Sequence, residues 1–202
     1  MLGIEGKSKR EIRKIVWDYM EKNNIVSFPR PCYGRIPNFL NSNIACERMV
    51  ELEEFKNANC IFCAPDYVLK RAREIVLEYE KKLAVATPHM REFLEIKGKN
   101  TEAVYIKGFK KFGKKLKTKV ELIVQGSVAV DRLGNRIGKG KGYGDKEYWY
   151  LLENSLLNEN AKVLTVVHDV QVFDELSIPF KEYDVKVDYI LTPTKIINCK
   201  SD

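Results

Sequence analysis

Glycines alternate with basic residues in one stretch of this chain, and that composition suits the binding of an anion. The stretch runs from Gly134 to Asp145 and reads G-N-R-I-G-K-G-K-G-Y-G-D. Glycine lets the backbone approach a ligand closely, and free amides in a loop before a helix N-terminus form an anion site. A flexible, solvated basic loop has the same composition, so the loop alone leaves both interpretations open.

The acidic residue at the end of this loop has two roles open to it. Asp145 stands where the helix D-K-E-Y-W-Y-L-L-E is predicted to begin. It can cap that helix, or it can hold Mg²⁺, which prefers hard oxygen ligands. The glycine spacing matches neither the Walker loop G-x-x-x-x-G-K-[ST] nor the Rossmann pattern G-x-G-x-x-G, so these two motifs do not identify the anion.

The loop resembles the signature of the 5-formyltetrahydrofolate cyclo-ligases, also called methenyltetrahydrofolate synthetases, which reads G-x-R-L-G-Y-G-G-G-Y-Y-D-R. The matching residues are Arg136, Gly138, Gly140, Gly142, Tyr143 and Asp145, whereas Lys139, Lys141 and Gly144 replace Tyr, Gly and Tyr. The stretch is also similar to the methenyltetrahydrofolate synthase domain-containing branch, whose pattern is G-S-V-A-V-x-x-x-G-x-R-I-G-K-G-x-G-Y/F-x-D-x-E-Y. Residues 126–130, 136–140 and 145–148 follow that branch pattern.

Both ends of the chain carry further resemblance. Ser8 and Glu11 form a capping box, and the apolar spacing predicts a helix over 8–23. The family begins with K-x-x-L/I-R on its first helix, where the basic residues reach the ATP phosphates, and Lys9, Ile12 and Arg13 match that spacing. Near the other end the family pattern is Q-x-V…P-x-x-x-x-D-V-x-V-D-x-I/V-x-T. The matching residues are Gln171, Val172, Pro179, Asp184, Val185, Val187, Asp188, Tyr189, Ile190 and Thr192. The resemblance implies that this region closes the nucleotide site.

The resemblance implies an ATP-dependent cyclo-ligase acting on 5-formyltetrahydrofolate or a related reduced pterin. ATP would phosphorylate the formyl oxygen, N10 would attack the activated carbon, and phosphate would leave as the 5,10-methenyl form is made. Such chemistry needs charge neutralisation more than a covalent nucleophile. The implied nucleotide-binding residues are Lys9, Arg13, Gly134, Arg136, Gly138, Lys139, Gly140, Lys141, Gly142 and Asp145, with Asp145 as the Mg²⁺ ligand and Arg136, Lys141 and Tyr143 as catalytic residues.

Two other functions remain open. One is non-catalytic binding of a nucleotide or RNA, because the net charge is +7 and the run from Lys107 to Lys119 interleaves lysines with Phe109 and Phe112. The same spacing fits a helix whose aromatic residues turn inward. The other is an ATP-dependent ligase or kinase for a different small molecule, since a fold does not determine a function.

An alternation of strands and helices must position these residues. Strands are predicted at 60–64, 83–86, 122–124, 162–167 and 185–191, and helices at 8–23, 43–55, 65–82, 101–112 and 145–157. This order predicts an α/β fold of three layers, with helices on both faces of a mostly parallel sheet. The resemblance implies the Rossmann-like architecture shared with sugar-phosphate isomerases and CoA transferases. We expect residues 1–202 to form a single domain.

Two further segments supply pocket candidates. His89 and Arg91 follow a strand end, where ligands bind in open α/β sheets, although His89 also suits an exposed loop. The segment 28–39, F-P-R-P-C-Y-G-R-I-P-N-F, contains three prolines that exclude a regular helix. Its arginines and aromatic residues either line a pocket or pin a segment that wraps the domain.

The composition is that of an ordinary globular protein, with 45% hydrophobic and 31% charged residues among 202. No apolar run is long enough to span a bilayer. Residues 1–10 lack the apolar core of a signal peptide, so we expect a cytoplasmic location and no membrane partner. Cys60 and Cys63 lie in the apolar run C-I-F-C-A, which favours buried free thiols over zinc ligands. The sequence leaves the oligomeric state open.

Overall fold

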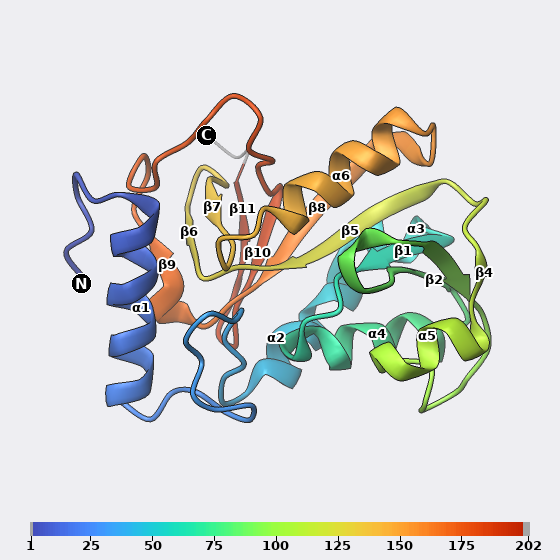
Figure 1. The fold of residues 1–202 in the computed structure, drawn as a ribbon, viewed down its shortest axis with the longest axis horizontal. Coiled ribbons are helices and arrows are strands. Elements are labelled where there is room, and N and C mark those ends of the chain that lie inside the picture. Colours follow the sequence, from blue (N-terminus) through green and yellow to red (C-terminus); the bar gives the residue numbers. More distant parts are fainter. Residues whose placement is uncertain (1, 200–202) are drawn as a thin grey trace.

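The computed structural model describes residues 2–199, and its largest element is an eight-stranded β-sheet (Figure 1). The strands lie in the order β11-β10-β8-β5-β1-β2-β3-β4. Their bounds are β1 Cys60–Cys63, β2 Lys82–Ala86, β3 Phe93–Ile96, β4 Lys114–Lys115, β5 Val120–Gly126, β8 Leu157–Val166, β10 Tyr189–Leu191 and β11 Ile196–Asn198.

The neighbouring strands from β10 to β2 are parallel, and the strands added at both edges are antiparallel. Numbered along the chain, the parallel strands have the doubly wound order 2-1-3-4-5, which reverses between β1 and β5. All side chains of β1 are buried, as its uninterrupted apolar run predicts for an inner parallel strand. The predicted mostly parallel α/β sheet is confirmed.

Helices flank this sheet on both faces, which confirms the three-layer prediction. Helix α6 (Tyr143–Glu153) contacts β5 on one side, while α2 (Ser42–Glu47) and α4 (Lys70–Glu78) contact β8, β1 and β2 on the other (Figure 1). The remaining helices are α1 Lys9–Lys22, α3 Glu53–Asn57, α5 Ile106–Phe112 and the short 3₁₀ turns η1 Arg48–Glu51, η2 Tyr67–Leu69, η3 Pro88–Met90 and η4 Asp169–Gln171.

A smaller three-stranded sheet supports the first helix. Its strands, in spatial order, are β7 Arg136–Ile137, β6 Ala129–Asp131 and β9 Val172–Phe173. Helix α1 contacts β6 and buries Ile12, Val16 and Met20. The predicted capping box at its start is confirmed, because Ser8 and Glu11 exchange hydrogen bonds there. The basic face of α1 is therefore held in a defined orientation.

The helix predicted over 43–55 is wrong as a continuous element. Leu52 has extended backbone dihedrals (φ −76°, ψ 134°), so α2, η1 and α3 follow one another with a break before α3. The break lets Met49, Leu52 and Phe55 all reach the core, whereas Ile44 stays 41% exposed. Burial of these three side chains outweighs the continuity of one helix.

Three other predicted helices have different bounds. The helix predicted over 65–82 begins only after η2, because Asp66 is extended, and it ends at Glu78 before the positive φ of Glu80. The helix predicted over 101–112 begins at Ile106, since the carbonyl oxygen of Val104 is held by the buried Arg73 guanidinium at 2.7 Å. Helix α6 begins two positions before the predicted start at 145 and ends at Glu153.

The strand predicted over 185–191 is shorter, because only β10 pairs with its neighbours. Upstream of β10, the backbone N–H of Val187 donates to the carbonyl oxygen of Gly134 at 2.9 Å instead of joining the sheet.

Cys60 and Cys63 are buried free thiols, as predicted, and burial raises the pKa of Cys60 to about 12. Among residues 2–199, no helix has both the length and the apolar character needed to cross a bilayer.

Candidate functional site

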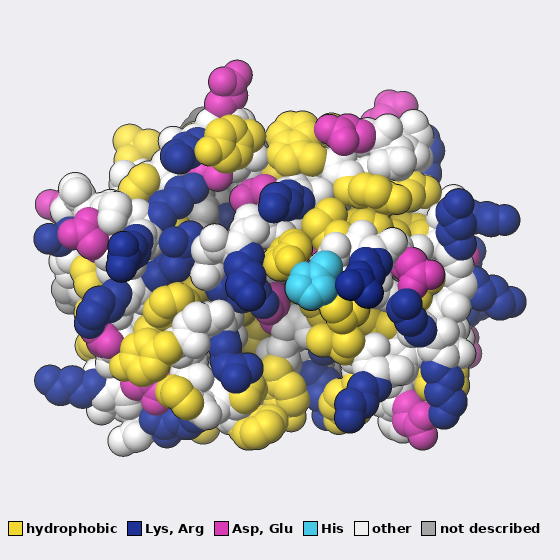
Figure 2. All heavy atoms as spheres, viewed as in Figure 1, with side chains coloured by type: hydrophobic (Ala, Val, Ile, Leu, Met, Phe, Trp, Pro, Cys, Tyr) yellow, Lys and Arg dark blue, Asp and Glu magenta, His cyan; other side chains and the backbone are white. Residues whose placement is uncertain are grey.

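A cavity of about 380 Å³ opens at the carboxyl ends of β1, β2 and β5. Asp66 follows β1, Thr87 follows β2, and Gln125 lies near the end of β5, and all three line the cavity. The strand order reverses between β1 and β5, which is where doubly wound sheets bind ligands. Figure 2 shows Lys and Arg side chains gathered around the middle of this face.

The glycine-rich loop and α1 form one wall of the cavity. The predicted site residues that line the cavity are Lys9, Arg13, Arg136, Gly138, Lys139, Gly140, Lys141, Gly142, Tyr143 and Asp145.

Gly134 does not line the cavity. Its φ is +85°, and a Cβ there would lie 2.1 Å from the carbonyl oxygen of Val187, so glycine is required by a tight turn.

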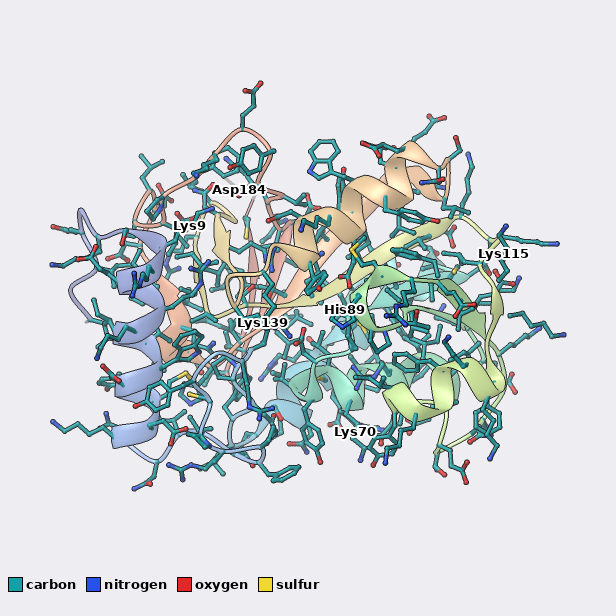
Figure 3. All side chains as sticks on the ribbon, viewed as in Figure 1. Lys9, Lys70, His89, Lys115, Lys139 and Asp184 are labelled. Atoms are coloured by element: carbon teal, nitrogen blue, oxygen red, sulfur yellow. The ribbon has the colours of Figure 1, made fainter. Side chains whose placement is uncertain are left out.

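Helix α1 holds the loop directly. The Nε of Arg13 donates to the carbonyl oxygen of Gly138 at 2.7 Å, and burial lowers the pKa of the Arg13 guanidinium. Lys9 forms an ion pair with Asp184, which belongs to the C-terminal region that the resemblance implied would close the site. Figure 3 shows Lys9 and Asp184 near each other, with Lys139 and His89 nearer the middle of the view.

Arg136 lies inside the protein beneath the loop. It is 8% exposed, and its guanidinium donates to Ser127 Oγ at 3.2 Å, to the carbonyl oxygen of Gly126 at 3.1 Å and to Asp145 Oδ1 at 3.4 Å. Burial lowers the pKa of this guanidinium. A Cβ at Gly144 would lie 2.9 Å from its Nη2 atom, so the glycine at this position leaves room for the bound arginine.

Asp145 does not cap helix α6, contrary to one of its two predicted roles. The N-cap is Gly142, with φ +69°, and Asp145 lies in the first turn. Its Oδ1 accepts from Arg136 and also from the backbone N–H of Val185 at 2.9 Å. Asp145 therefore joins the loop, α6 and the C-terminal segment.

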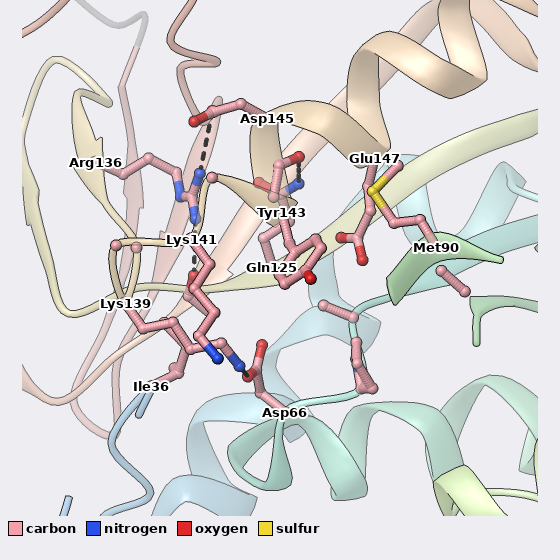
Figure 4. Close-up of a pocket in the computed structure, with 18 of the residues that line it drawn as sticks. Ile36, Asp66, Met90, Gln125, Arg136, Lys139, Lys141, Tyr143, Asp145 and Glu147 are labelled. Atoms are coloured by element: carbon pink, nitrogen blue, oxygen red, sulfur yellow. Dashed lines mark hydrogen bonds and ion pairs between the residues drawn. The ribbon is translucent and has the colours of Figure 1, made fainter. Parts of the chain in front are cut away.

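Two lysines of the loop differ in their surroundings (Figure 4). Lys139 Nζ lies 3.0 Å from Asp66 Oδ1 and bridges the two sides of the cavity. Lys141 is exposed, and within residues 2–199 it makes neither a hydrogen bond nor an ion pair. Its positive charge is therefore available to an anion. The neighbouring Gly140 has φ +106°, a backbone conformation that favours glycine.

The opposite wall is more apolar. His89, Met90 and Ile106 line it together with Tyr143, and His89 Nδ1 lies 3.1 Å from the Tyr143 hydroxyl. His89 and Met90 both have positive φ, 60° and 56°, a costly conformation that is common at ligand sites. Arg91, the other pocket candidate here, lies outside this cavity.

The segment 28–39 wraps the domain, as the second of its two interpretations states. Of its residues only Ile36 lines the cavity, where it packs against Gly126. Phe28 is 68% exposed, and Arg30 forms an ion pair with Glu21 at 2.6 Å. The arginines and aromatic residues of this segment are therefore not pocket residues.

Sequence reasoning missed two buried polar residues of the cavity, Gln125 and Glu147. Gln125 interrupts the apolar run of β5, and Glu147 lies four positions before Leu151, the other buried residue of α6. Burial, and after it the negative charge of Asp66, raises the pKa of Glu147 to about 8. The polar Gln125 at the end of an apolar strand was an available signal, whereas no pattern in the sequence singled out Glu147.

The donor set does not form a preformed metal cage. Among the residues that the structure describes, no group of three or more His, Cys, Asp and Glu side chains is placed to hold a metal ion. Mg²⁺ usually keeps water ligands and binds one or two carboxylates together with substrate phosphates. Asp145 thus suits a magnesium ion that a nucleotide brings, rather than one bound by the protein alone.

Comparisons with known proteins agree with the motifs. The sequence model of the 5-formyltetrahydrofolate cyclo-ligase family matches residues 5–193. A methenyltetrahydrofolate synthase domain-containing protein of Bos taurus is 40% identical over 205 residues, covering 95% of this chain and 54% of the relative. The Homo sapiens protein of the same name is 38% identical over 210 residues, covering 96% and 55%. The chain thus spans about half the length of these relatives.

A solved structure has the same fold. The 5,10-methenyltetrahydrofolate synthetase of Aquifex aeolicus superposes with a TM-score of 0.61 at 21% identity, covering 96% of this chain and 94% of the other.

Proposed function

Because the chain belongs to the 5-formyltetrahydrofolate cyclo-ligase family, we propose that it is an ATP-dependent cyclo-ligase. Its substrate would be 5-formyltetrahydrofolate or a related reduced pterin, and its products the 5,10-methenyl form, ADP and phosphate. The observation that carries the proposal is a single cavity with a cationic, glycine-rich wall and an apolar, aromatic wall. These two walls suit the two substrates of such a ligase.

The cationic wall supports ATP binding. Lys9, Arg13, Lys139 and Lys141 converge on the cavity from α1 and the loop. Phosphoryl transfer depends on neutralising phosphate charge and on in-line positioning. We assign the phosphates to these side chains and to the loop backbone at Gly138, Gly140 and Gly142. Arg136 is bonded internally, so its proposed contribution to catalysis is to position the loop and Asp145.

The apolar wall supports the pterin. Tyr143 and Met90 offer flat and polarisable surfaces, which suit a heterocyclic ring. ATP phosphorylates the formyl oxygen, N10 then attacks the activated carbon, and phosphate leaves as the N10 proton is lost. Mg²⁺ held by Asp145 would neutralise the nucleotide phosphates when bound. Both the reduced pterin as substrate and Mg²⁺ as the metal ion belong to the proposal.

The test is turnover of 5-formyltetrahydrofolate with MgATP, followed by the near-ultraviolet absorbance of the methenyl product. We expect wild-type protein to form the product and a Lys141→Met variant to need much more ATP. Lys99→Met is the matched control, because Lys99 is exposed and lies outside the cavity. Absence of product, with MgATP still bound in calorimetry, would move the assignment to another ligase or kinase substrate.

RNA binding by the run 107–119 stays an untested alternative, and the burial of one aromatic residue and two ion pairs disfavour it. Phe109 is fully buried, so it cannot stack on a base. Lys110 and Lys111 form ion pairs with Glu92 and Glu102.

We also propose that residues 1–202 form one domain, and one continuous hydrophobic cluster supports this. The cytoplasm is the proposed compartment, which suits the free thiols.

A further inference from the structure

The net positive charge of this protein is concentrated in one segment that the proposed reaction does not use. Residues 91–119 carry ten Lys and Arg side chains but only three Glu side chains. The whole chain carries 35 basic and 28 acidic residues, so the remainder is balanced, with 25 of each sign. The segment therefore accounts for the entire net charge of +7. None of its basic side chains, all of which the structure describes, lines the cavity described above.

The segment folds at one end of the molecule. It forms β3, α5 and β4 with the turns between them, and Figure 1 shows α5 and β4 at the end farthest from α1. Figure 3 places Lys115 at this end. In the described part of the chain β4 pairs with β3 alone, so its outer edge is open. An open strand edge exposes backbone N–H and C=O groups that can pair with another chain.

The acidic side chains of the segment are already engaged. Glu92 forms an ion pair with Lys110 at 2.8 Å. Glu102 forms one with Lys111 at 2.9 Å, and Glu95 forms one with a lysine of β2 at 3.2 Å. The other lysines of the segment are exposed and form no ion pair with any described residue: Lys97, Lys99, Lys107, Lys114, Lys115, Lys117 and Lys119. These side chains form the basic edge, whose charge is not neutralised locally.

A second cavity, of about 570 Å³, lies beside the basic edge. Its lining combines apolar side chains with cations, among them Phe93, Leu116, Tyr150, Arg91, Lys110 and Lys115. Tyr150 is 38% exposed, and its ring stacks on Phe93 with centroids 4.1 Å apart and 8° between the planes. Figure 2 shows hydrophobic side chains at the surface here, next to Lys and Arg side chains at the right-hand end. The cavity therefore suits an apolar group that is attached to anionic groups.

We propose that the basic edge binds an extended acidic segment of a partner protein, and that one bulky apolar side chain of this segment occupies the second cavity. Three features of the surface select such a partner. Carboxylates complement the lysines that have no ion pair. An extended chain can add a strand to the open edge of β4 through main-chain hydrogen bonds. The apolar side chain removes the exposed part of Tyr150 from water.

The same surface is less suited to single-stranded nucleic acid, which stacks its bases on exposed aromatic side chains. Phe93 and Phe109 are buried, and Lys111 Nζ lies over the Phe112 ring, 4.9 Å from its centroid. An extended peptide offers both N–H and C=O groups to an open strand edge, whereas a phosphodiester offers acceptors alone. The observations therefore favour a peptide as the occupant.

The test uses a fluorescein-labelled peptide in which glutamates flank one phenylalanine on both sides, and it measures fluorescence anisotropy with the full chain. Wild-type protein should show saturable binding that weakens as salt screens the lysines. The double variant Lys114→Glu, Lys115→Glu should bind at least about tenfold more weakly. The control, Lys22→Glu, Lys195→Glu, changes the net charge equally at exposed lysines elsewhere and should bind within about threefold of wild type.

Two altered peptides test the cavity and the strand edge separately. Serine in place of the phenylalanine should weaken binding to wild type about tenfold, because one aromatic side chain is no longer buried. The same exchange should have little effect on binding to Tyr150→Ser protein. N-methylation of alternate backbone amides should weaken binding about tenfold in one of its two registers only, since alternate amides face β4. Equal binding in both registers would overturn the pairing with β4.

The outcomes decide the proposal without reference to ligase activity. No saturable binding would show that the lysines only keep the edge from pairing with other chains, which overturns the proposal. Equal loss in the two double variants would show attraction to the net charge rather than to this edge, and would overturn it as well. Tighter binding of an oligouridylate than of the peptide, lost in Lys114→Glu, Lys115→Glu, would replace the peptide by a nucleic acid.

Discussion

The side chain of Arg13 donates a hydrogen bond from Nε to the carbonyl oxygen of Gly138 at 2.7 Å, across 125 positions of the sequence. This contact ties the basic face of α1 to the glycine-rich loop. It leaves the rest of the guanidinium beside Gly140, where a Cβ would lie 3.5 Å from Arg13 Cζ. The helix and the loop, which carry separate motifs, therefore form one cationic wall.

Replacing Arg13 by alanine should raise the KM for ATP by about tenfold or more, because a charge-assisted hydrogen bond and a cation are lost together. The measurement is initial rate against ATP concentration. Arg10→Ala on the exposed part of the same helix is the control. Equal KM values in the two variants would remove Arg13 from the nucleotide site.

Lys141→Met should weaken ATP binding without changing the stability of the fold. Lys141 has no partner within the described part of the chain, so its loss should raise the KM for ATP about tenfold while the Tm stays unchanged. Thermal unfolding and ATP kinetics on the same preparation check both expectations. A lowered Tm with an unchanged KM would contradict the assignment.

Arg136→Met should lower the free energy of unfolding by about 3 kcal/mol, because it leaves Asp145 without its buried cation. Denaturant unfolding measures this loss. The double variant Arg136→Met, Asp145→Asn should recover part of it, since the unpaired charge is removed. A double variant that is as unstable as the sum of the single variants would show that the ion pair is not the cause.

Gly134→Ala should lower the free energy of unfolding by about 2 kcal/mol or more, because alanine disfavours φ of +85° and its Cβ would overlap the Val187 carbonyl oxygen. Gly3→Ala is the control, since a Cβ at Gly3 meets nothing within 4 Å. Folded Gly134→Ala protein should retain wild-type affinity for ATP. A selective loss of ATP affinity would return Gly134 to the nucleotide site.

The stability of wild-type protein should fall relative to Glu147→Gln as pH rises from about 4.5 to about 8. The pKa of Glu147 is raised from 4.5 to about 8, so within this window the folded state keeps a proton that the unfolded state has lost. Proton binding by the folded state makes stability decrease with pH. Above pH 8 the loss of unfolding free energy relative to Glu147→Gln should level off at about a few kcal/mol. Denaturant unfolding across this pH range, with Glu153→Gln as control, measures it.

Local rules were sufficient for several parts of this protein. The capping box of Ser8 and Glu11 predicted the first helix, because its hydrogen bonds join residues three apart. The uninterrupted apolar runs at 60–64 and 122–124 predicted inner strands for the same kind of reason. The family resemblance, carried by the spacing of the glycine-rich loop, placed that loop beside α1 and the C-terminal region.

Contacts between distant segments decided the remainder. The break at Leu52 depends on which side chains the sheet can bury, and the roles of Gly134 and Arg136 depend on Val187, Ser127 and Asp145. Glu147 reads as an ordinary polar helix residue in the sequence. Only the packing of α6 against β5 buries it and raises its pKa, because desolvation depends on neighbours from the whole fold.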